Sequence, residues 1–237
     1  MWAIVVAGGS GRRFGGRKQF LPLAGHPVAS WSVRAAASVA DGVVLVVPSA
    51  DAAAGGDHTE AGDDSGTDAV APAPGSTGGA ALGATCVVSG GATRADSVRA
   101  GLAAVPDDAA VIVVHDAARP LAAPELFARV VDAVRTGDVD GAVPVVPVTD
   151  TLKRVEDGRV VTTVDRDGLV AVQTPQAFAA TALRAAHAGS GQATDDAALF
   201  EAAGSAVAPV TGDPRNLKLT RPEDLALAEA LLAGVCP

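Results

Sequence analysis

Short runs of β-branched and other apolar residues recur along the chain and constrain its fold more than any other feature. They cover residues 3–7, 43–47, 85–89, 110–114 and 141–146. Each run is apolar almost throughout, which is the pattern of strands buried on both faces of a parallel sheet. Helix-like stretches lie between them, at 27–40, 94–105 and 124–136. This alternation predicts an α/β fold with a mostly parallel central sheet covered on both sides.

The 237 residues are enough for one sizeable core, so we interpret 1–237 as a single domain. Further helices are expected after Thr194 and from about 222 to 234. Two sequences resemble capping boxes: Thr93 with Asp96 before the helix at 94–105, and Thr220 with Glu223 before the last helix.

Two segments interrupt the alternation. Residues 51–83 consist almost entirely of small and polar residues, which cannot bury enough surface to offset their ordering entropy, and we expect a low-complexity flexible insertion. Residues 148–168 alternate polar and apolar residues around Asp157-Gly158, which predicts a β-hairpin. A hairpin that protrudes from an α/β body often contacts a partner subunit, so we expect a dimerisation arm.

The composition excludes several classes of function. A formal net charge of −9 is unfavourable for binding a nucleic-acid backbone or an anionic membrane surface. No signal peptide and no apolar run long enough to span a bilayer are recognisable, so we expect a cytoplasmic protein. Cys86 and Cys236 form no CxxC pattern, and no metal site built from protein ligands is expected.

A glycine-rich segment directly after the first apolar run is the first candidate site. Ala7, Gly8, Gly9 and Gly11 would let backbone N–H groups approach phosphate oxygens, and Arg13 and Lys18 would add positive charge. The segment lacks the GK[ST] of a P-loop and the spacing of GxGxxG, so a dehydrogenase is a weak interpretation. An ordinary strand-to-helix turn with solvated basic residues is the alternative.

The run at 110–114 leads into a second candidate site. Asp116 would accept hydrogen bonds from substrate hydroxyls at the carboxyl end of the strand, and Arg119 would hold a phosphate or orient Asp116. An Asp–Arg pair that pins a turn explains the segment equally well, and His115 is expected to pack beneath the site. Taken singly, Arg166 and Lys218 fit solvated surface charges better than ligands.

Taken together, these segments resemble the 2-C-methyl-D-erythritol 4-phosphate cytidylyltransferase family. The resemblance is carried by AIVVAGGSGRRFGGRKQF, GGATRADSV, VHDAARP, DTLKRV, TVDRDGL, QTPQAF, TDDAALFEAAG and NLKLTRPEDLALAEALL. It implies a Rossmann-like nucleotidyltransferase fold with a protruding hairpin arm, and a homodimer that exchanges these arms. It also implies Mg²⁺-dependent transfer of CMP from CTP to 2-C-methyl-D-erythritol 4-phosphate, with the metal held mainly by the CTP phosphates. Pyrophosphate is the second product.

The resemblance also implies roles for single residues. The catalytic cations would be Arg13, Lys18, Arg166 and Lys218. The nucleotide would be held by Ala7, Gly8, Gly9, Gly11, Gly91 and Ser97. The acceptor would be bound by Asp116, Arg119, Thr151, Arg166, Thr174 and Lys218. Ala92 stands where many members carry Asp, and Asp196 where Glu is common.

Two other functions remain open from the sequence. A cytidylyltransferase for another polyol phosphate, such as ribitol 5-phosphate, would share the body and the HDAARP-like segment. A non-catalytic nucleotide-binding paralogue is the alternative from another class, and the retained basic residues Arg13, Lys18, Arg166 and Lys218 disfavour it.

Overall fold

The computed structural model describes residues 1–8, 14, 17–49, 82–189, 191 and 195–234. Its main feature is an eight-stranded sheet with the order β10-β7-β11-β6-β1-β4-β5, in which β12 also pairs with β7. The strands are β1 (Trp2–Val6), β4 (Gly42–Val47), β5 (Cys86–Ser89), β6 (Val111–Asp116), β7 (Gly141–Pro147), β10 (Val170–Val172), β11 (Gln176–Ala179) and β12 (Val207–Thr211).

Parallel pairing dominates the sheet, as the apolar runs predict. The parallel pairs are β1–β4, β1–β6, β4–β5 and β7–β12, whereas β10 and β11 pair antiparallel with their neighbours. Within this register Val6 lies opposite Asp116. The segments that follow β1 and β6 therefore leave the sheet side by side.

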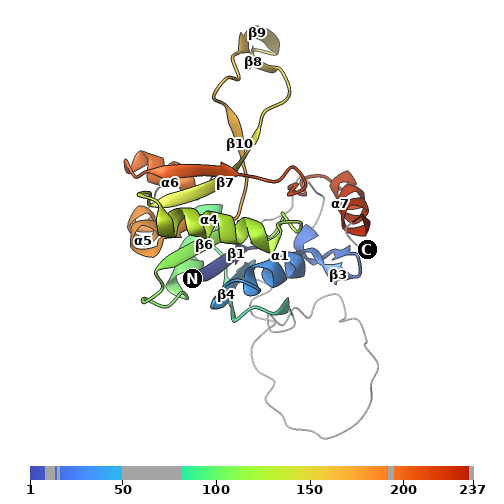
Figure 1. Cartoon of the computed structure of the whole chain (residues 1–237). Helices are drawn as coiled ribbons and strands as arrows, with labels where there is room; N and C mark the ends of the chain where they lie inside the picture. The colour runs from blue at the N-terminus through green and yellow to red at the C-terminus, as the bar shows by residue number, and fades with distance from the viewer. Residues whose placement is uncertain (9–13, 15–16, 50–81, 190, 192–194, 235–237) are drawn as a thin grey trace, which may run out of the picture.

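Helices cover both faces of the sheet (Figure 1). On one face α1 (Val28–Ala37) and α4 (Pro124–Thr136) pack on a cluster that includes Ala3 and Val5. On the other face α3 (Arg94–Ala103), α5 (Ala180–His187) and α6 (Asp196–Ala202) pack on a cluster that includes Ile4. Successive residues of β1 thus enter opposite cores, which explains why the strand is apolar throughout.

A third, smaller core lies beside the carboxyl edge of the sheet. It joins α7 (Glu223–Ala233) to the short strand β2 (Pro22–Leu23), which pairs with β3 (His26–Pro27). Leu23 and Leu219 are fully buried in it, together with Val28. This core holds the segment before α7 near the short helix η1 (Lys18–Phe20), and so it places Lys218 near Lys18.

The predicted hairpin is confirmed as β8 (Leu152–Glu156) paired antiparallel with β9 (Arg159–Val164). Asp157 and Gly158 form the turn with positive φ angles of 47° and 74°, which suit an Asp-Gly hairpin turn. The hairpin stands away from the body of the molecule (Figure 1) and exposes Val155 and Val160. Its role in dimerisation stays a prediction.

One of the two predicted capping boxes is confirmed. Thr93 and Asp96 exchange side-chain and backbone hydrogen bonds at the start of α3. The box of Thr220 with Glu223 is wrong, because Pro222 is the N-cap of α7. The N-cap lies two residues beyond Thr220, and the carboxylate of Asp224 accepts from the Thr220 N–H (2.6 Å) and the Thr220 hydroxyl (3.0 Å) instead.

Several predictions fall on residues that are not described. Gly9, Gly11 and Arg13 lie outside the described residues, as does the insertion 51–83 except for Leu82 and Gly83. Leu82 is buried in the first core. Among the described residues, we find no helix with the length and apolar character needed to cross a membrane.

Candidate active site

A pocket of about 430 Å³ lies beyond the carboxyl ends of β1 and β6, where parallel sheets bind ligands. Its lining residues come from four of the segments that carry the family resemblance. The lining residues are Val6, Ala7, Gly8, Lys18, Gln19, Gly91, Ala92, Thr93, Arg94, Ser97, Asp116, Ala117, Ala118 and Lys218. We call this the first pocket.

Glycines bring two backbone segments close to α3 at the first pocket. A Cβ atom at Gly91 would lie 2.3 Å from the Cβ of Asp96, and one at Gly8 would lie 3.3 Å from the Ser97 hydroxyl oxygen. Ser97 in turn donates to the carbonyl of Thr93 (2.9 Å). This wall therefore presents backbone and small side chains to a ligand, which suits a sugar or a base that approaches closely.

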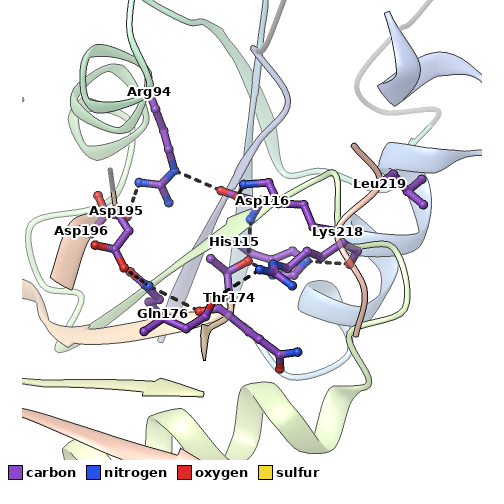
Figure 2. A network of polar contacts seen from close by, with 12 residues as sticks. Arg94, His115, Asp116, Thr174, Gln176, Asp195, Asp196, Lys218 and Leu219 are labelled. Carbon is purple, nitrogen blue, oxygen red and sulfur yellow. Dashed lines mark hydrogen bonds and ion pairs between the residues drawn. The ribbon is translucent and has the colours of Figure 1, made fainter. Parts of the chain in front are cut away.

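Asp116 is the centre of the polar network at the pocket wall (Figure 2). One carboxylate oxygen accepts from Arg94 Nε (3.1 Å) and the other from Lys218 Nζ (2.6 Å). Burial alone would raise the pKa of Asp116, but the positive charges of Arg94 and Lys218 outweigh it and hold that pKa well below its ordinary value. Asp116 is therefore an ionised anchor for two cations.

His115 supports this anchor from below. Thr174 Oγ1 accepts from the backbone N–H of Asp116 (3.0 Å) and lies 3.1 Å from His115 Nδ1. His115 Nε2 lies 3.2 Å from the carbonyl of Arg119, so the ring donates there and accepts from Thr174. Burial lowers the pKa of His115 to about 4. The imidazole is therefore neutral near pH 7 and packs beneath the site, as the sequence predicts.

The first pocket receives two lysines from opposite ends of the chain. Lys18 Nζ donates to the carbonyl of Leu219 and lies 5.9 Å from the centre of the Phe14 ring. Leu219 N–H donates to the carbonyl of Ala118 (2.8 Å), which ties the Lys218 segment to the end of β6. Lys18 and Lys218 thus line the same pocket, although 200 residues of sequence separate them.

A second pocket of about 420 Å³ adjoins the first. The two share Arg94, Asp116 and Lys218, which form a common wall. The second pocket is otherwise lined by Arg119, Val143, Val172, Gln173, Thr174, Gln176, Asp195, Ala197, Ala198 and Glu201.

Comparisons with known proteins identify the family of the chain. A family model described as IspD, 2-C-methyl-D-erythritol 4-phosphate cytidylyltransferase, matches residues 1–234. The chain is also 46% identical over 235 residues to the 2-C-methyl-D-erythritol 4-phosphate cytidylyltransferase of Nocardia farcinica, with 97% of this chain and 93% of that protein covered. The chain belongs to this family. The IspD fold agrees: a solved structure of the Thermus thermophilus cytidylyltransferase covers 97% of this chain and is itself 98% covered, with a TM-score of 0.74 and 33% identity.

Some IspD relatives are longer than this chain. The bifunctional IspD/IspF enzyme of Nitratidesulfovibrio vulgaris is 44% identical over 241 residues, which cover 97% of this chain. The chain spans 57% of the length of that relative.

The structure gathers many of the site residues predicted from the IspD resemblance. The first pocket contains Ala7, Gly8, Lys18, Gly91, Ser97, Asp116 and Lys218. The second pocket contains Asp116, Arg119, Thr174 and Lys218. Thr151 and Arg166 lie instead on the exposed arm, where Arg166 donates to the carbonyl of Thr149.

Arg119 has other partners than the sequence suggests. Its guanidinium donates to the carbonyls of Asn216 (2.8 Å) and Val172 (3.4 Å), whereas Asp116 pairs with Arg94 and Lys218. Arg119 therefore has a structural role, but it holds the backbone at Asn216 and Val172 and does not pair with Asp116. Its contact with an acceptor stays a prediction.

Sequence analysis missed Arg94. It lines both pockets and forms ion pairs with Asp116 and, at 2.7 Å, with Asp196. Its place directly after Thr93 made it resemble an ordinary first residue of a capped helix. A usable signal was present, because an arginine after Gly90-Gly91 stands where a helix begins at the ligand edge of a sheet.

Proposed function

We propose that the chain transfers CMP from CTP to 2-C-methyl-D-erythritol 4-phosphate and releases pyrophosphate. The observation that supports this most is the grouping of Lys18, Lys218, Arg94 and Asp116 at one pocket wall in a member of the IspD family. The activity named for relatives such as the Cereibacter sphaeroides cytidylyltransferase, 44% identical over 238 residues, supports the same reaction.

In this proposal the first pocket binds CTP. The cytidine would lie against the glycine-lined wall of Gly8, Gly91 and Ser97, where backbone groups can hydrogen-bond to the ring and ribose. The triphosphate would then extend toward Lys18 and Lys218. Arg13 belongs to the same proposal by its place in the sequence, between Gly11 and Lys18.

The chemistry requires that two anions approach each other. An oxygen of the acceptor phosphate attacks the α-phosphorus of CTP, the bond from that phosphorus to the pyrophosphate oxygen breaks, and pyrophosphate leaves with the electron pair. The attacking phosphate is already ionised at neutral pH, so the reaction needs no general base. Fixed cations such as Lys18 and Lys218 stabilise the charge that develops, and one such donor is worth about 3–4 kcal/mol.

The second pocket would bind the acceptor. Asp116 and Thr174 face its polyol part, and Lys218 lies at the wall shared with CTP, where the two phosphates must meet. Thr151 and Arg166 of a second copy would complete the site by binding the acceptor phosphate. This requires a homodimer in which each arm reaches the partner's body.

Mg²⁺ belongs to the proposal, because enzymes of this family are usually metal-dependent. Among the described residues no group of three or more His, Cys, Asp or Glu side chains could hold a metal ion. Asp116 is the carboxylate of the first pocket, and Arg94 and Lys218 already engage both of its oxygens. The donor set therefore fits an Mg²⁺ ion held chiefly by triphosphate oxygens and water, where it would neutralise phosphate charge.

The test is pyrophosphate release from CTP and Mg²⁺ with each candidate acceptor. Release with 2-C-methyl-D-erythritol 4-phosphate, and much less with ribitol 5-phosphate at equal concentration, is the expected result. A preference for ribitol 5-phosphate would reassign the acceptor. Absence of release with either phosphate, while CTP still binds, would favour a non-catalytic nucleotide-binding protein.

A further inference from the structure

Arg94 is fixed by two carboxylates, and only one of them belongs to the pockets. Asp116 lines both pockets, whereas Asp196 lines neither. Asp196 is the first residue of α6, and its side chain is only 1% exposed. A carboxylate this deeply buried, paired with an active-site arginine but out of reach of a ligand, needs an explanation.

Asp196 belongs to a series of hydrogen bonds that runs from Asp116 through Arg94 to His187 on α5. His187, the last residue of that helix and also buried, places Nε2 3.0 Å from Asp196 Oδ1. Asp196 Oδ2 accepts from Arg94 Nη1 at 2.7 Å, and Arg94 Nε donates to Asp116 Oδ1 at 3.1 Å. Figure 2 shows Arg94 extended between Asp116 and Asp196.

This geometry fixes the orientation of the Arg94 guanidinium. The group is planar and its N–H donors lie in that plane, so hydrogen bonds from Nε and Nη1 to two different carboxylates fix its orientation. Burial opposes its charge, but Asp196 and Asp116 together raise the pKa of Arg94 above its ordinary value. Arg94 is thus a permanent cation with a single orientation at the shared wall.

We propose that Asp196 and His187 are positioning residues that orient Arg94 and, through it, Asp116 and Lys218. The inference rests on the proposed function, because the wall they align is where the two phosphates would meet. His187 holds the Asp196 carboxylate, Asp196 holds Arg94, and Arg94 holds one oxygen of Asp116 while Lys218 takes the other.

The first experiment compares substitutions that remove different hydrogen bonds of this series. Asp196→Asn should lower kcat for pyrophosphate release about tenfold or more, since small displacements of catalytic groups are costly. KM for CTP should change less than about threefold, because Asp196 does not touch the nucleotide pocket. His187→Leu should have the same pattern with a smaller loss, and His187→Gln, which keeps a donor, should restore most of kcat.

Arg184→Gln is the matched structural control. Arg184 also lies on α5 and anchors it by donating to the carbonyls of Leu102 (3.0 Å) and Val105 (2.8 Å). This substitution should lower the unfolding temperature while kcat stays unchanged. An equal loss of kcat in the control and in Asp196→Asn would mean that loosening α5 and α6 is enough, and it would overturn the proposal.

A double-mutant cycle with Arg94→Gln tests whether Asp196 acts through Arg94. If it does, Asp196→Asn should lower kcat less than about twofold in the Arg94→Gln background, because the link is already broken. Multiplicative losses would contradict the inference. If circular dichroism shows that Asp196→Asn is unfolded, His187→Leu takes its place in the cycle and the same criterion decides.

A crystallographic comparison separates this inference from the proposed function. A wild-type chain that releases no pyrophosphate would reject the function alone. Crystal structures of the wild type and the folded variant would then decide the positioning role. A lost Arg94–Asp116 hydrogen bond in the variant would support the role, and a retained one would overturn it.

Discussion

Asp116 divides its two carboxylate oxygens between two cations, Arg94 and Lys218, and this division determines what the residue can do. Its pKa lies well below the ordinary value, so it does not accept a proton at neutral pH and is not a general base. What it contributes is the placement of two positive charges at the wall shared by the pockets. His115 and Thr174 fix its backbone from below.

Asp116→Asn should reduce turnover about a hundredfold or more, because both cations lose their common partner. The free energy of unfolding should also fall by about 3 kcal/mol, since a buried ion-pair network loses the carboxylate that Arg94 and Lys218 share. Pyrophosphate release and urea unfolding measure the two effects. Asp41→Asn, which removes an exposed carboxylate that contacts the N-terminal amine, should leave turnover unchanged.

The lowered pKa of His115 should make the free energy of unfolding depend on pH. Its pKa is about 4 in the folded state and about 6.5 when unfolded, so the folded state disfavours the protonated ring. The contribution of His115 to the free energy of unfolding is fully present above about pH 6.5. It is lost as the pH falls from about 6.5 to about 4, and the total loss is up to about 3 kcal/mol. The lowered pKa of Asp116 acts only below that pH range.

The measurement compares urea unfolding of the wild type and His115→Gln at several pH values between 7 and 4. The wild type should lose stability more steeply than the variant as the pH falls. Parallel curves for the two proteins would show that His115 titrates normally in the folded state.

At the scale of elements, the segment between β12 and α7 is held by side chains instead of by regular pairing. Gln173 donates to the carbonyl of Asp213 (2.8 Å) and accepts from the Asp213 N–H (3.1 Å), as a neighbouring strand would. Asn216 is fully buried and donates to the carbonyl of Thr174 (2.9 Å). Lys218 therefore owes its position to a loop that is fixed from several sides.

Gln173→Leu should release this loop. We expect the free energy of unfolding to fall by about 1–3 kcal/mol, because the Asp213 backbone groups lose their partners. Turnover should fall as well, since Lys218 lies in the same segment. Gln173→Glu keeps an acceptor for the Asp213 N–H but turns a buried carboxylate oxygen toward the Asp213 carbonyl, so its loss of stability at neutral pH should be at least as large as that of Gln173→Leu; a much smaller loss would contradict this account.

The sequence predicts five strands of the sheet, β1, β4, β5, β6 and β7, because each contains a run of apolar residues. It does not predict β10, β11 or β12, because three to five residues are too short for a distinct apolar pattern and their pairing is set by the tertiary fold. Lys18 and Asp116 are candidates from the segments that follow the first and fourth apolar runs, whereas Lys218 is assigned only through the family resemblance. Arg94 has a weaker sequence signal, because its partners Asp116 and Asp196 lie 22 and 102 residues away and only the tertiary fold brings them near.

At the scale of the whole molecule, two of the predicted site residues lie on the hairpin arm, away from the pockets that contain the others. Thr151 and Arg166 line neither of the two pockets in a single copy, and the arm stands apart from the body that carries those pockets (Figure 1). The proposed homodimer would resolve this separation. Each complete site would then take its lysines from one copy and Arg166 from the other.

Mixed dimers test this arrangement. Lys18→Ala and Arg166→Ala should each lower activity by orders of magnitude in separate homodimers. Co-refolding equal amounts of the two variants should restore about a quarter of wild-type activity, because half the dimers are mixed and each has one intact site. Mixtures that stay as inactive as the separate variants would show that the arm does not complete a partner's site.

The wall of Arg94, Asp116 and Lys218 has one more consequence, because a single set of charges faces both cavities. A ligand that moves any of these three side chains from one side changes the surface offered to a ligand on the other. Such linkage is reciprocal: whatever factor the nucleotide imposes on acceptor affinity, the acceptor imposes on nucleotide affinity. We therefore expect binding in either cavity to change the affinity of the other through these three side chains.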